Sequence, residues 1–459
     1  MDTNAPKTPA TLPFAAWQAM SPGDAARELH ARVAALPEPL RHAALAWLKP
    51  EPELAAELAD AKTVGASLLA TQDVRVASKF APTTDTARPL SGVPYLLKDL
   101  FDLAGVPTKA GSTFIDRARD QPTRDSAIAL RLRALGAACA GKTHLVEFAA
   151  GLFGDNAHYG DCPHPRFPDR LSGGSSSGSA ALVAAGVVPL AIGTDTGGSV
   201  RVPAAWCGLF GFRLTARDQL IRDALPLSPT MDTAGWFTAN AADMLTAWGA
   251  ITGSSRRETA GKTSGLTTAA TPRGLYLNLR KLLPESDKKV DEACARTAAL
   301  FAVKADAVTE EALLASWQNA VESYTVTALS EAHAIHRAWL APYHGHYESS
   351  IWQRFSDGGR YTPDQLNYAA TAMENVQAVF RQFFATYDYL VLPAVPFPAL
   401  RKAECTAEAR RQLLTLTTPA SLAGLPVLSL PVSLPSGLTV GLQVILPAAD
   451  SPVVPWVLR

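Results

Sequence analysis

The hydrophobic pattern of this chain is densest between Leu171 and Arg217, where two glycine-rich clusters enclose a run of small apolar residues. The run reads AALVAAGVVPLAIG and has almost no polar interruption, which is typical of a helix and a strand buried inside a domain. Glycine-rich turns on both sides of it bring backbone N–H groups and hydroxyl groups to places that a ligand can approach closely. We therefore predict that this stretch carries the chemistry.

Before this stretch, apolar residues recur at helical spacing from Ser21 to about residue 72. Ser21 followed by proline is a typical helix start, and prolines at positions 37, 39, 50 and 52 divide the segment into two or three helices. The pattern predicts a helical layer over residues 21–75. Residues 1–20 begin with a polar stretch rich in proline and threonine, and we predict that they are disordered.

An apolar strand that ends at Lys98 begins the next part of the chain. A helix over about residues 125–135 then leads to a strand at 137–141, and this alternation continues through Arg213. Such a rhythm indicates an α/β sheet that is covered by helices on both faces. Residues 153–170, rich in Gly, Pro and aromatic residues, are predicted to form a loop beside the glycine clusters.

The last third of the chain returns to a helical pattern over residues 317–388, where aromatic residues are frequent. Three apolar stretches follow at 389–393, 425–432 and 441–446, and we predict that they complete the same sheet. The predicted fold is α/β, with a large central mixed sheet covered by helices on both faces and the N-terminal helical layer above it. Residues 21–459 are predicted to form a single domain.

The composition of the chain mainly argues against certain classes of partner and site. The 459 residues include 42 basic and 42 acidic side chains, so a formal net charge of zero gives no attraction to nucleic acid or anionic membranes. The five cysteines are scattered without a C-x-x-C pair, which indicates neither a disulfide framework nor a zinc site. The N-terminus does not resemble a signal peptide, and no apolar run approaches the roughly 18 residues of a membrane span. We expect a cytoplasmic protein without nucleic-acid or membrane partners.

Three motifs offer alternative sites. Ser176 stands at the centre of a G-x-S-x-G pattern, but no convincing strand precedes it as a nucleophile elbow requires. The glycine clusters match neither a P-loop nor a dinucleotide-binding fingerprint. Four histidines lie close together in the sequence without an H-E-x-x-H pattern, and no metal site is predicted from them: His333, His336, His344 and His346.

The segment GGSSSGSAALVAAGVVPLAIGTDTGGSVRVPAAWCG resembles the glycine/serine signature of the amidase signature family. The stretch GVPYLLKD around Lys98 is similar to the lysine strand of that family. The turn Thr230–Gly235 resembles its later S-x-D-x-x-G turn, with threonine in the serine position. Further similarity lies in the C-terminal strands, at Pro419–Pro431 and Gly441–Gln443. The resemblance covers roughly residues 85–250 and 370–447.

This resemblance implies a triad of Lys98, Ser175 preceded by a cis peptide bond, and Ser199 as the nucleophile. A serine hydroxyl is a poor nucleophile until a base takes its proton, and a lysine can do so only when it is uncharged. Burial disfavours the ammonium form and lowers the pKa of a lysine, here to an expected ~7–8. Ser175 would then pass the proton between Ser199 and Lys98. No cofactor or metal is expected.

The turn before Ser199 is expected to stabilise the negative charge of a tetrahedral intermediate. The predicted oxyanion hole consists of the backbone N–H groups of Thr196, Gly197, Gly198 and Ser199. Asp195 and Arg201 are expected to hold this turn through hydrogen bonds and an ion pair. The chain departs from the G-L-K-P-T that the family commonly has after its signature, since it reads Gly211-Phe212-Arg213-Leu214-Thr215.

The resemblance implies hydrolysis of amides, and also of esters and carbamates, through an acyl-enzyme. The residues expected to line the substrate pocket are Ala149, Gly151, Phe153 and Tyr159. Together with the aromatic segment 317–388 they predict an apolar pocket, suited to small neutral aryl or alkyl amides, anilides and urethanes. We expect a monomer or homodimer whose partner is a small amide or carbamate.

One alternative is the glutaminase (A-type) subunit of a tRNA-dependent amidotransferase, which resembles the same family. Such subunits typically have Gln directly after the signature arginine, whereas this chain has Val202. A binding module without catalytic activity would be expected to lack part of the triad, and all three residues are present.

Overall fold

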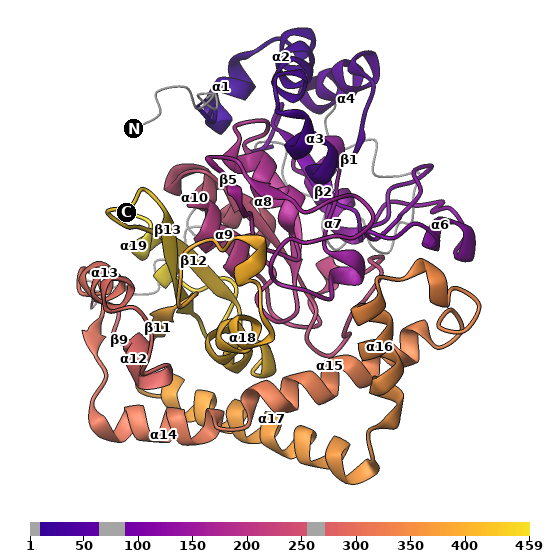
Figure 1. Cartoon of the computed structure of the whole chain (residues 1–459). Helices are drawn as coiled ribbons and strands as arrows, with labels where there is room; N and C mark the ends of the chain where they lie inside the picture. The colour runs from indigo at the N-terminus through magenta and orange to yellow at the C-terminus, as the bar shows by residue number, and fades with distance from the viewer. Residues whose placement is uncertain (1–9, 64–87, 255–270) are drawn as a thin grey trace.

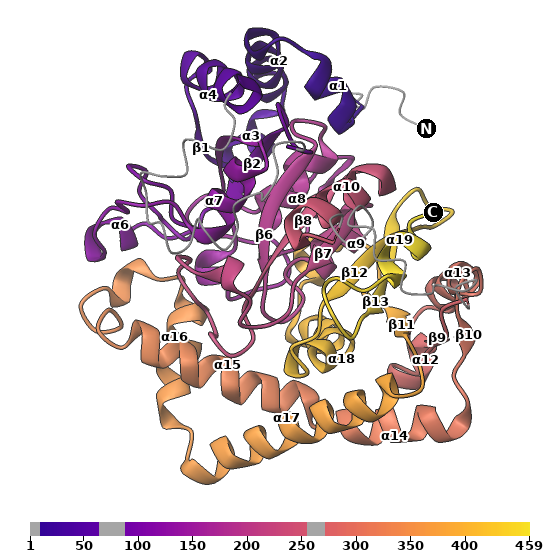
Figure 2. The same cartoon turned by 180° about the vertical axis from the view of Figure 1, so that it is seen from behind.

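A single mixed sheet of 11 strands organises the computed structural model, which describes residues 10–63, 88–254 and 271–459. Figure 2 shows this sheet in the middle of the molecule. In spatial order, the strands are β1 (Leu45–Leu48), β3 (Ala138–Thr143), β2 (Pro94–Lys98), β6 (Leu190–Asp195), β8 (Thr233–Thr238), β7 (Phe210–Arg213), β12 (Val427–Ser433), β13 (Thr439–Ile445), β11 (Tyr389–Pro393), β9 (Gly274–Tyr276) and β10 (Val303–Lys304). A separate two-stranded sheet is formed by β4 (Pro163–His164) and β5 (Phe167–Leu171).

The strands change direction across the sheet. Strand β2 pairs in parallel with β3 and β6, and β9 pairs in parallel with β10 and β11. Between these two parallel regions the pairing from β6 to β11 is antiparallel. The predicted large mixed sheet is therefore confirmed, and the three late strands do complete it.

Helices surround the sheet (Figure 1). The N-terminal layer contains α1 (Phe14–Ala19), α2 (Pro22–Ala34), α3 (Glu38–Ala44) and α4 (Glu51–Thr63). The helices that follow are α6 (Ile115–Ala118), α7 (Ala127–Ala134), α8 (Ser177–Ala184), α9 (Arg201–Cys207), α10 (Ala241–Thr252), α12 (Leu279–Leu282) and α13 (Lys288–Ala298). The remaining helices are α14 (Ala307–Trp317), α15 (Ala320–His336), α16 (Ser349–Asp357), α17 (Pro363–Phe384), α18 (Ala407–Leu422) and α19 (Val453–Val457).

The alternation of side chains along β2 shows how the sheet divides the interior. Tyr95 and Leu97 belong to the core that includes residues of α7 and α10, whereas Leu96 belongs to the core that includes residues of α8 and the N-terminal layer. Successive side chains of a strand point to opposite faces, so Lys98 lies on the same face as Leu96. This alternation places the Lys98 side chain on the face of the sheet that α8 covers.

The N-terminal region departs from the prediction in two places. Residues 14–19 form α1 instead of a disordered segment, because Phe14 and Trp17 are buried and the N–H of Phe14 donates to the Asp243 carboxylate. Within the predicted helical layer, β1 pairs antiparallel with β3 at the edge of the sheet. The predicted helix start at Ser21 is confirmed, since its hydroxyl accepts from the Asp24 N–H. Residues 1–9 and 64–75 of these predictions lie outside the described part of the chain.

The other end of the molecule is built by α14–α17, which cross below the sheet in Figure 1. Several aromatic side chains of this segment stack on other rings. Phe114 stacks on Tyr343, with 4.5 Å between ring centroids, and Trp317 stacks on Phe380 at 5.8 Å. The predicted helical character of residues 317–388 is confirmed. Among the helices of the described ranges, none combines the length and apolar character that crossing a membrane requires.

Candidate active site

Lys98 ends β2 and is completely buried. Its ammonium nitrogen lies 2.7 Å from Ser175 Oγ, 3.0 Å from Ser176 Oγ and 2.8 Å from Thr194 Oγ1. Burial lowers the pKa of Lys98 to about 7, although the carboxylates of Asp232 and Asp195 raise it. The lysine can therefore be uncharged near neutral pH, as the sequence predicts for a base.

The hydroxyl groups around Lys98 can be assigned by counting donors. An uncharged lysine has two N–H groups and one lone pair, so it can donate to two of the three hydroxyls and accept from the third. Ser176 Oγ donates to the Thr194 carbonyl at 3.1 Å, which leaves its lone pairs to accept from Lys98. Ser175 Oγ makes no second hydrogen bond among the described residues and can donate to the lysine. The peptide bond between Gly174 and Ser175 is cis.

Ser199 lies just before α9, at the end of a glycine turn, and only 3% of its surface is exposed. The N–H groups of Thr196, Gly197 and Ser199 have no hydrogen-bond partner within the described ranges, so they are available for an oxyanion. Gly198 is different: its N–H donates to Asp195 Oδ1 at 2.9 Å. The structure therefore removes Gly198 from the predicted oxyanion hole. The described residues show no hydrogen bond between Ser199 and Ser175, and contacts of this type often tighten only with bound substrate.

Asp195 holds this turn together with two arginines. Arg201 Nη2 donates to Asp195 Oδ1 at 2.8 Å, and Arg213 Nη1 donates to the same oxygen at 2.9 Å. All three side chains are fully buried. Burial would raise the pKa of Asp195, but the two guanidinium groups outweigh it and hold this pKa far below its ordinary value. The supporting positions predicted for Asp195 and Arg201 agree with these contacts, whereas the sequence analysis assigned no role to Arg213.

Asp232 is a second carboxylate that the sequence analysis did not single out. Its Oδ1 accepts from the Thr196 hydroxyl at 2.5 Å, and its Oδ2 accepts from the N–H groups of Leu227 and Ser228. Burial raises its pKa to about 6. The signal was present in the sequence, because Asp232 is the acidic residue of the turn that resembles S-x-D-x-x-G.

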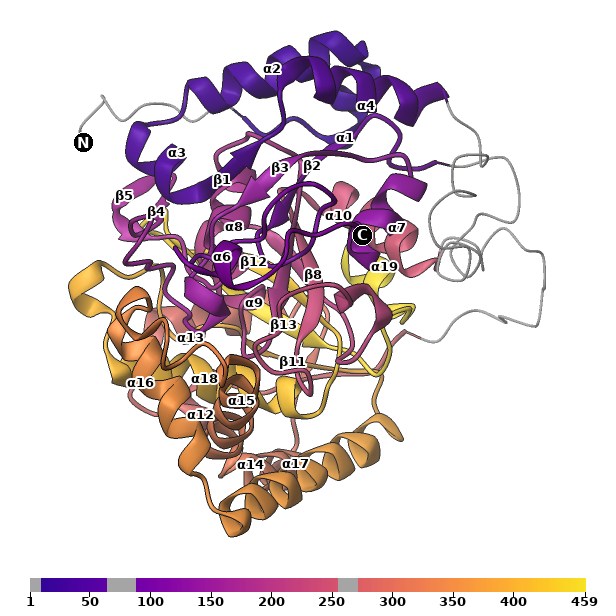
Figure 3. The same ribbon diagram turned by 90° about the vertical axis from the view of Figure 1, so that its right-hand side faces the viewer.

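A cavity opens beside Ser199, between the loop that carries Ala149 and the helices α15, α16 and α18 (Figure 3 shows these helices below the sheet). It brings Ser199 together with Ala149 and Gly151, as predicted. Two arginines also line it, and neither was singled out from the sequence. The residues around it are Ala149, Ala150, Gly151, Leu152, Ser199, Leu227, Tyr324, Thr325, Ala328, Leu329, Arg354, Phe355 and Arg410.

The other two predicted pocket residues lie elsewhere. Phe153 is buried in the core and stacks on Trp206, with 6.4 Å between ring centroids. Tyr159 stacks on His144 at 4.0 Å and donates its hydroxyl to the Ser112 carbonyl. Both rings are used in packing, so neither lines the cavity with Ser199.

A second cavity shares Ala149 and Leu227 with the first and is also lined by Thr194, Thr196 and Asp232. The two cavities are therefore neighbours at these two residues.

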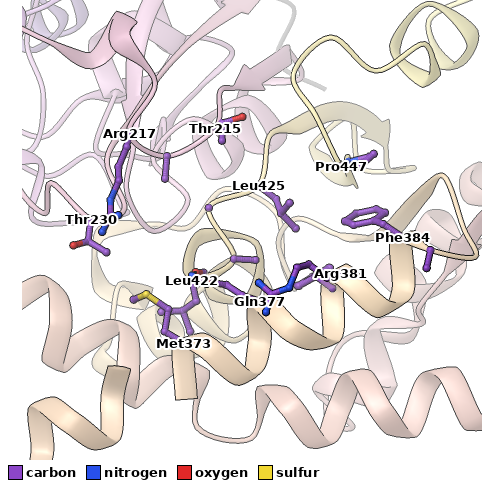
Figure 4. Close-up of a pocket in the computed structure, with 15 residues that line it drawn as sticks. Thr215, Arg217, Thr230, Met373, Gln377, Arg381, Phe384, Leu422, Leu425 and Pro447 are labelled. Atoms are coloured by element: carbon purple, nitrogen blue, oxygen red, sulfur yellow. The ribbon is translucent and has the colours of Figure 1, made fainter. Parts of the chain in front are cut away.

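Figure 4 shows a separate pocket between α17, the end of α18 and the loop after β7. None of the predicted catalytic residues lines it, and its arginines, Arg217 and Arg381, are exposed. The histidine group also lies outside the site: His336 is hydrogen-bonded to the Tyr347 hydroxyl and His333 to the Phe355 carbonyl. No group of metal-binding side chains is found in residues 10–63, 88–254 and 271–459.

The comparisons with known proteins agree with this geometry. A sequence model of a family described as Amidase matches residues 55–452. This chain belongs to the amidase family. The amidase is a hydrolase of the amidase-signature type, a class that acts on C–N bonds.

The relatives of the amidase differ in the names they carry. The A-type subunit of glutamyl-tRNA(Gln) amidotransferase from Symbiobacterium thermophilum is 33% identical over 403 residues, which cover 80% of this chain and 81% of that protein. Indoleacetamide hydrolase of Pseudomonas savastanoi is 43% identical over 166 residues, or 36% of either chain. A crystal structure described as an amidase superposes with a TM-score of 0.70 and 29% identity, and covers 95% of this chain and 97% of that one. These names point to different substrates.

Proposed function

We propose that the amidase hydrolyses small amides through an acyl-enzyme on Ser199, with Ser175 and Lys98 as the proton relay. The observation that carries this proposal is the fully buried Lys98, 2.7 Å from the Ser175 hydroxyl and with its pKa lowered to about 7. A buried lysine of this kind can accept a proton at neutral pH, which an exposed lysine cannot.

In the proposed reaction, Ser199 Oγ attacks the acyl carbon while its proton passes to Ser175, and the Ser175 proton passes to the lone pair of Lys98. The N–H groups of Thr196, Gly197 and Ser199 stabilise the resulting oxyanion. The C–N bond breaks when the amine nitrogen takes a proton back through Ser175. In the second half of the reaction, Ser175 and Lys98 take a proton from water while its oxygen adds to the ester of Ser199, and the acid leaves as the proton returns to Ser199 Oγ.

The proposed substrates are small aryl or alkyl amides and anilides. Ser199 is almost completely buried, and short side chains such as Ala149, Gly151 and Ala328 leave room beside it for a small acyl group. Carbamates and esters pass through the same tetrahedral step and are proposed as secondary substrates. The alternative is a glutaminase of the amidotransferase type, which the 33% identity to the Symbiobacterium protein supports and Val202 does not.

The experiment compares initial rates of the purified chain on an acyl-anilide, an aryl carbamate and glutamine. We expect turnover of the anilide or the carbamate, and a loss of roughly 10³-fold or more in Ser199→Ala. Activity that survives in Ser199→Ala but disappears in Ser176→Ala would contradict the proposed triad. Activity on glutamine alone would support the glutaminase alternative.

A further inference from the structure

The cavity beside Ser199 contains two guanidinium groups and no acidic side chain among the described residues that line it. Arg354 comes from α16 and Arg410 from α18, and both are mostly covered by the protein. We propose that these two arginines bind a carboxylate on the acyl part of the substrate, so that the amidase acts on half-amides of dicarboxylic acids. This inference rests on the proposed function and specifies its substrate class.

Arg354 is fixed in place but keeps free donors. Its Nε donates to the Ser350 carbonyl at 3.3 Å and its Nη2 donates to the Ala150 carbonyl at 2.8 Å. A guanidinium group has five N–H donors, so three remain after these two bonds. The bond to Ala150 ties the arginine to the wall of the cavity, because Ala150 itself lines it.

Arg410 also has an unsatisfied hydrogen-bond donor. Its Nε is buried and has no hydrogen-bond partner. Leaving such a donor unpaired in a covered position is unfavourable, whereas a ligand that accepts from it would recover the lost hydrogen bond. The helix that carries Arg410 also supports the catalytic turn, since the Thr417 hydroxyl donates to the Gly197 carbonyl at 2.6 Å. The arginine and the oxyanion donors are therefore positioned by one element.

The surrounding acids do not neutralise this pair. Burial and the positive charge of Arg410 together lower the pKa of Arg354 to about 10, although the charges of Glu348, Tyr324 and Asp155 act to raise it. The Glu348 carboxylate accepts from the Ser350 N–H and hydroxyl, and Asp155 pairs with Lys402 at 3.5 Å. Neither arginine forms an ion pair with a carboxylate in the described part of the chain. An anionic ligand would supply the missing charge.

The geometry of arginine favours a carboxylate for this role. The planar fork of a guanidinium group matches the two oxygens of a carboxylate, and such bonds are stronger than neutral ones. The apolar walls at Leu152, Leu227 and Ala328 suit the methylene groups between that carboxylate and the scissile amide. An amino acid amide such as glutamine would bring an ammonium group beside two guanidinium groups, so the inference favours acids that lack an amine. It replaces the expectation of a neutral substrate.

The test uses pairs of anilides that differ only at the end of the acyl chain. Succinanilate, which carries a free carboxylate, is compared with butyranilide, in which a methyl group replaces it, and malonanilate and glutaranilate with their neutral counterparts extend the series. We expect at least one anionic anilide to exceed its neutral counterpart in kcat/KM by roughly 10- to 100-fold, mainly through KM. In Arg354→Met and Arg410→Met this ratio should fall by a similar factor. Arg381→Met, from the separate pocket of Figure 4, is the matched control and should keep it.

A measurement of anilide binding, without hydrolysis, tests the anion site independently of the proposed function. Ser199→Ala protein is titrated with succinanilate and butyranilide in a calorimeter, with and without Arg354→Met. Tighter binding of succinanilate that disappears with Arg354→Met would support the anion site even if no anilide is hydrolysed. Absence of hydrolysis would then contradict only the proposed activity on anilides. Neutral anilides that bind or react as well as every anionic one would overturn the inference.

Discussion

The amidase contains two pairs of arginines near the turn that carries Ser199, and they differ in one respect. Arg201 and Arg213 share the carboxylate of Asp195, at 2.8 and 2.9 Å, and all three side chains are completely buried. Arg354 and Arg410 line the cavity beside Ser199 without a carboxylate partner among the described residues. The positive charge of the first pair is compensated by a carboxylate of the protein, whereas we infer that the charge of the second pair is compensated by a bound ligand.

This difference shows how the surroundings of an arginine determine its role. A buried guanidinium group is unfavourable unless an anion and hydrogen-bond acceptors surround it. Arg201 has these partners, because it also donates to the Thr417 carbonyl, to Gln443 Oε1 and to Ser421 Oγ. Arg410 lacks a partner for its buried Nε. We therefore expect the first pair to govern folding and the second to govern specificity.

The largest effect should come from removing the carboxylate that the first pair shares. Asp195→Asn leaves two buried guanidinium groups without their counter-ion and should lower the free energy of unfolding by about 3–5 kcal/mol. Urea denaturation followed by fluorescence measures this change. The matched control is Asp169→Asn, which breaks the exposed ion pair with Arg401 and should change the free energy by less than about 1 kcal/mol. Equal effects of the two substitutions would contradict the assigned role of Asp195.

An acidic side chain placed beside Arg354 and Arg410 should compensate their charge, as Asp195 does for Arg201 and Arg213. Ala328 lies in α15 and lines the cavity, so Ala328→Asp places an acidic group there. We expect the preference for succinanilate over butyranilide to fall by roughly 10- to 100-fold, because the new side chain competes for the arginines. Ala328→Asn, of similar size but uncharged, serves as the control. If both variants lose the preference equally, steric hindrance and not charge explains the loss.

Removing the second pair should not destabilise the protein. The double variant Arg354→Met/Arg410→Met eliminates two like charges that have no counter-ion, and methionine keeps most of the apolar stem. The free energy of unfolding should stay within about 1 kcal/mol of the original value, or rise. Urea denaturation beside Asp195→Asn makes the comparison direct. A loss as large as that of Asp195→Asn would show that both pairs are structural.

The smallest predicted effect is a shift in the pH profile, which reports on Lys98 and on neither arginine pair. Because the base must be uncharged, kcat/KM should rise with pH to a plateau, with a midpoint near the Lys98 pKa of about 7. The Asp232 carboxylate favours the ammonium form and raises this pKa, so Asp232→Asn should move the midpoint to lower pH, by roughly half a unit. The midpoint is the quantity to compare, because the same substitution also removes the hydrogen bond from Thr196. A midpoint that stays in place or moves upward would contradict the charge effect.

Much of the fold could be predicted from the sequence because its signals are local. The apolar strand that ends at Lys98, the buried run between the glycine clusters and the late apolar strands all have patterns that short-range physics explains. The cap at Ser21 is a contact within one turn of helix. By contrast, α1 forms because Phe14 and Trp17 find buried positions, and its own six residues do not indicate this.

For the candidate site, the sequence by itself determined which residues stand on the signature and therefore which side chains can form the relay and the turn. Only the tertiary structure decided that the Gly198 N–H is used by Asp195, that Arg213 shares this carboxylate, and that Phe153 and Tyr159 pack elsewhere. The structure alone also brings Arg354 and Arg410 to Ser199, from helices far along the chain. The physical reason is that a motif records neighbours in sequence, whereas charge compensation depends on neighbours in space.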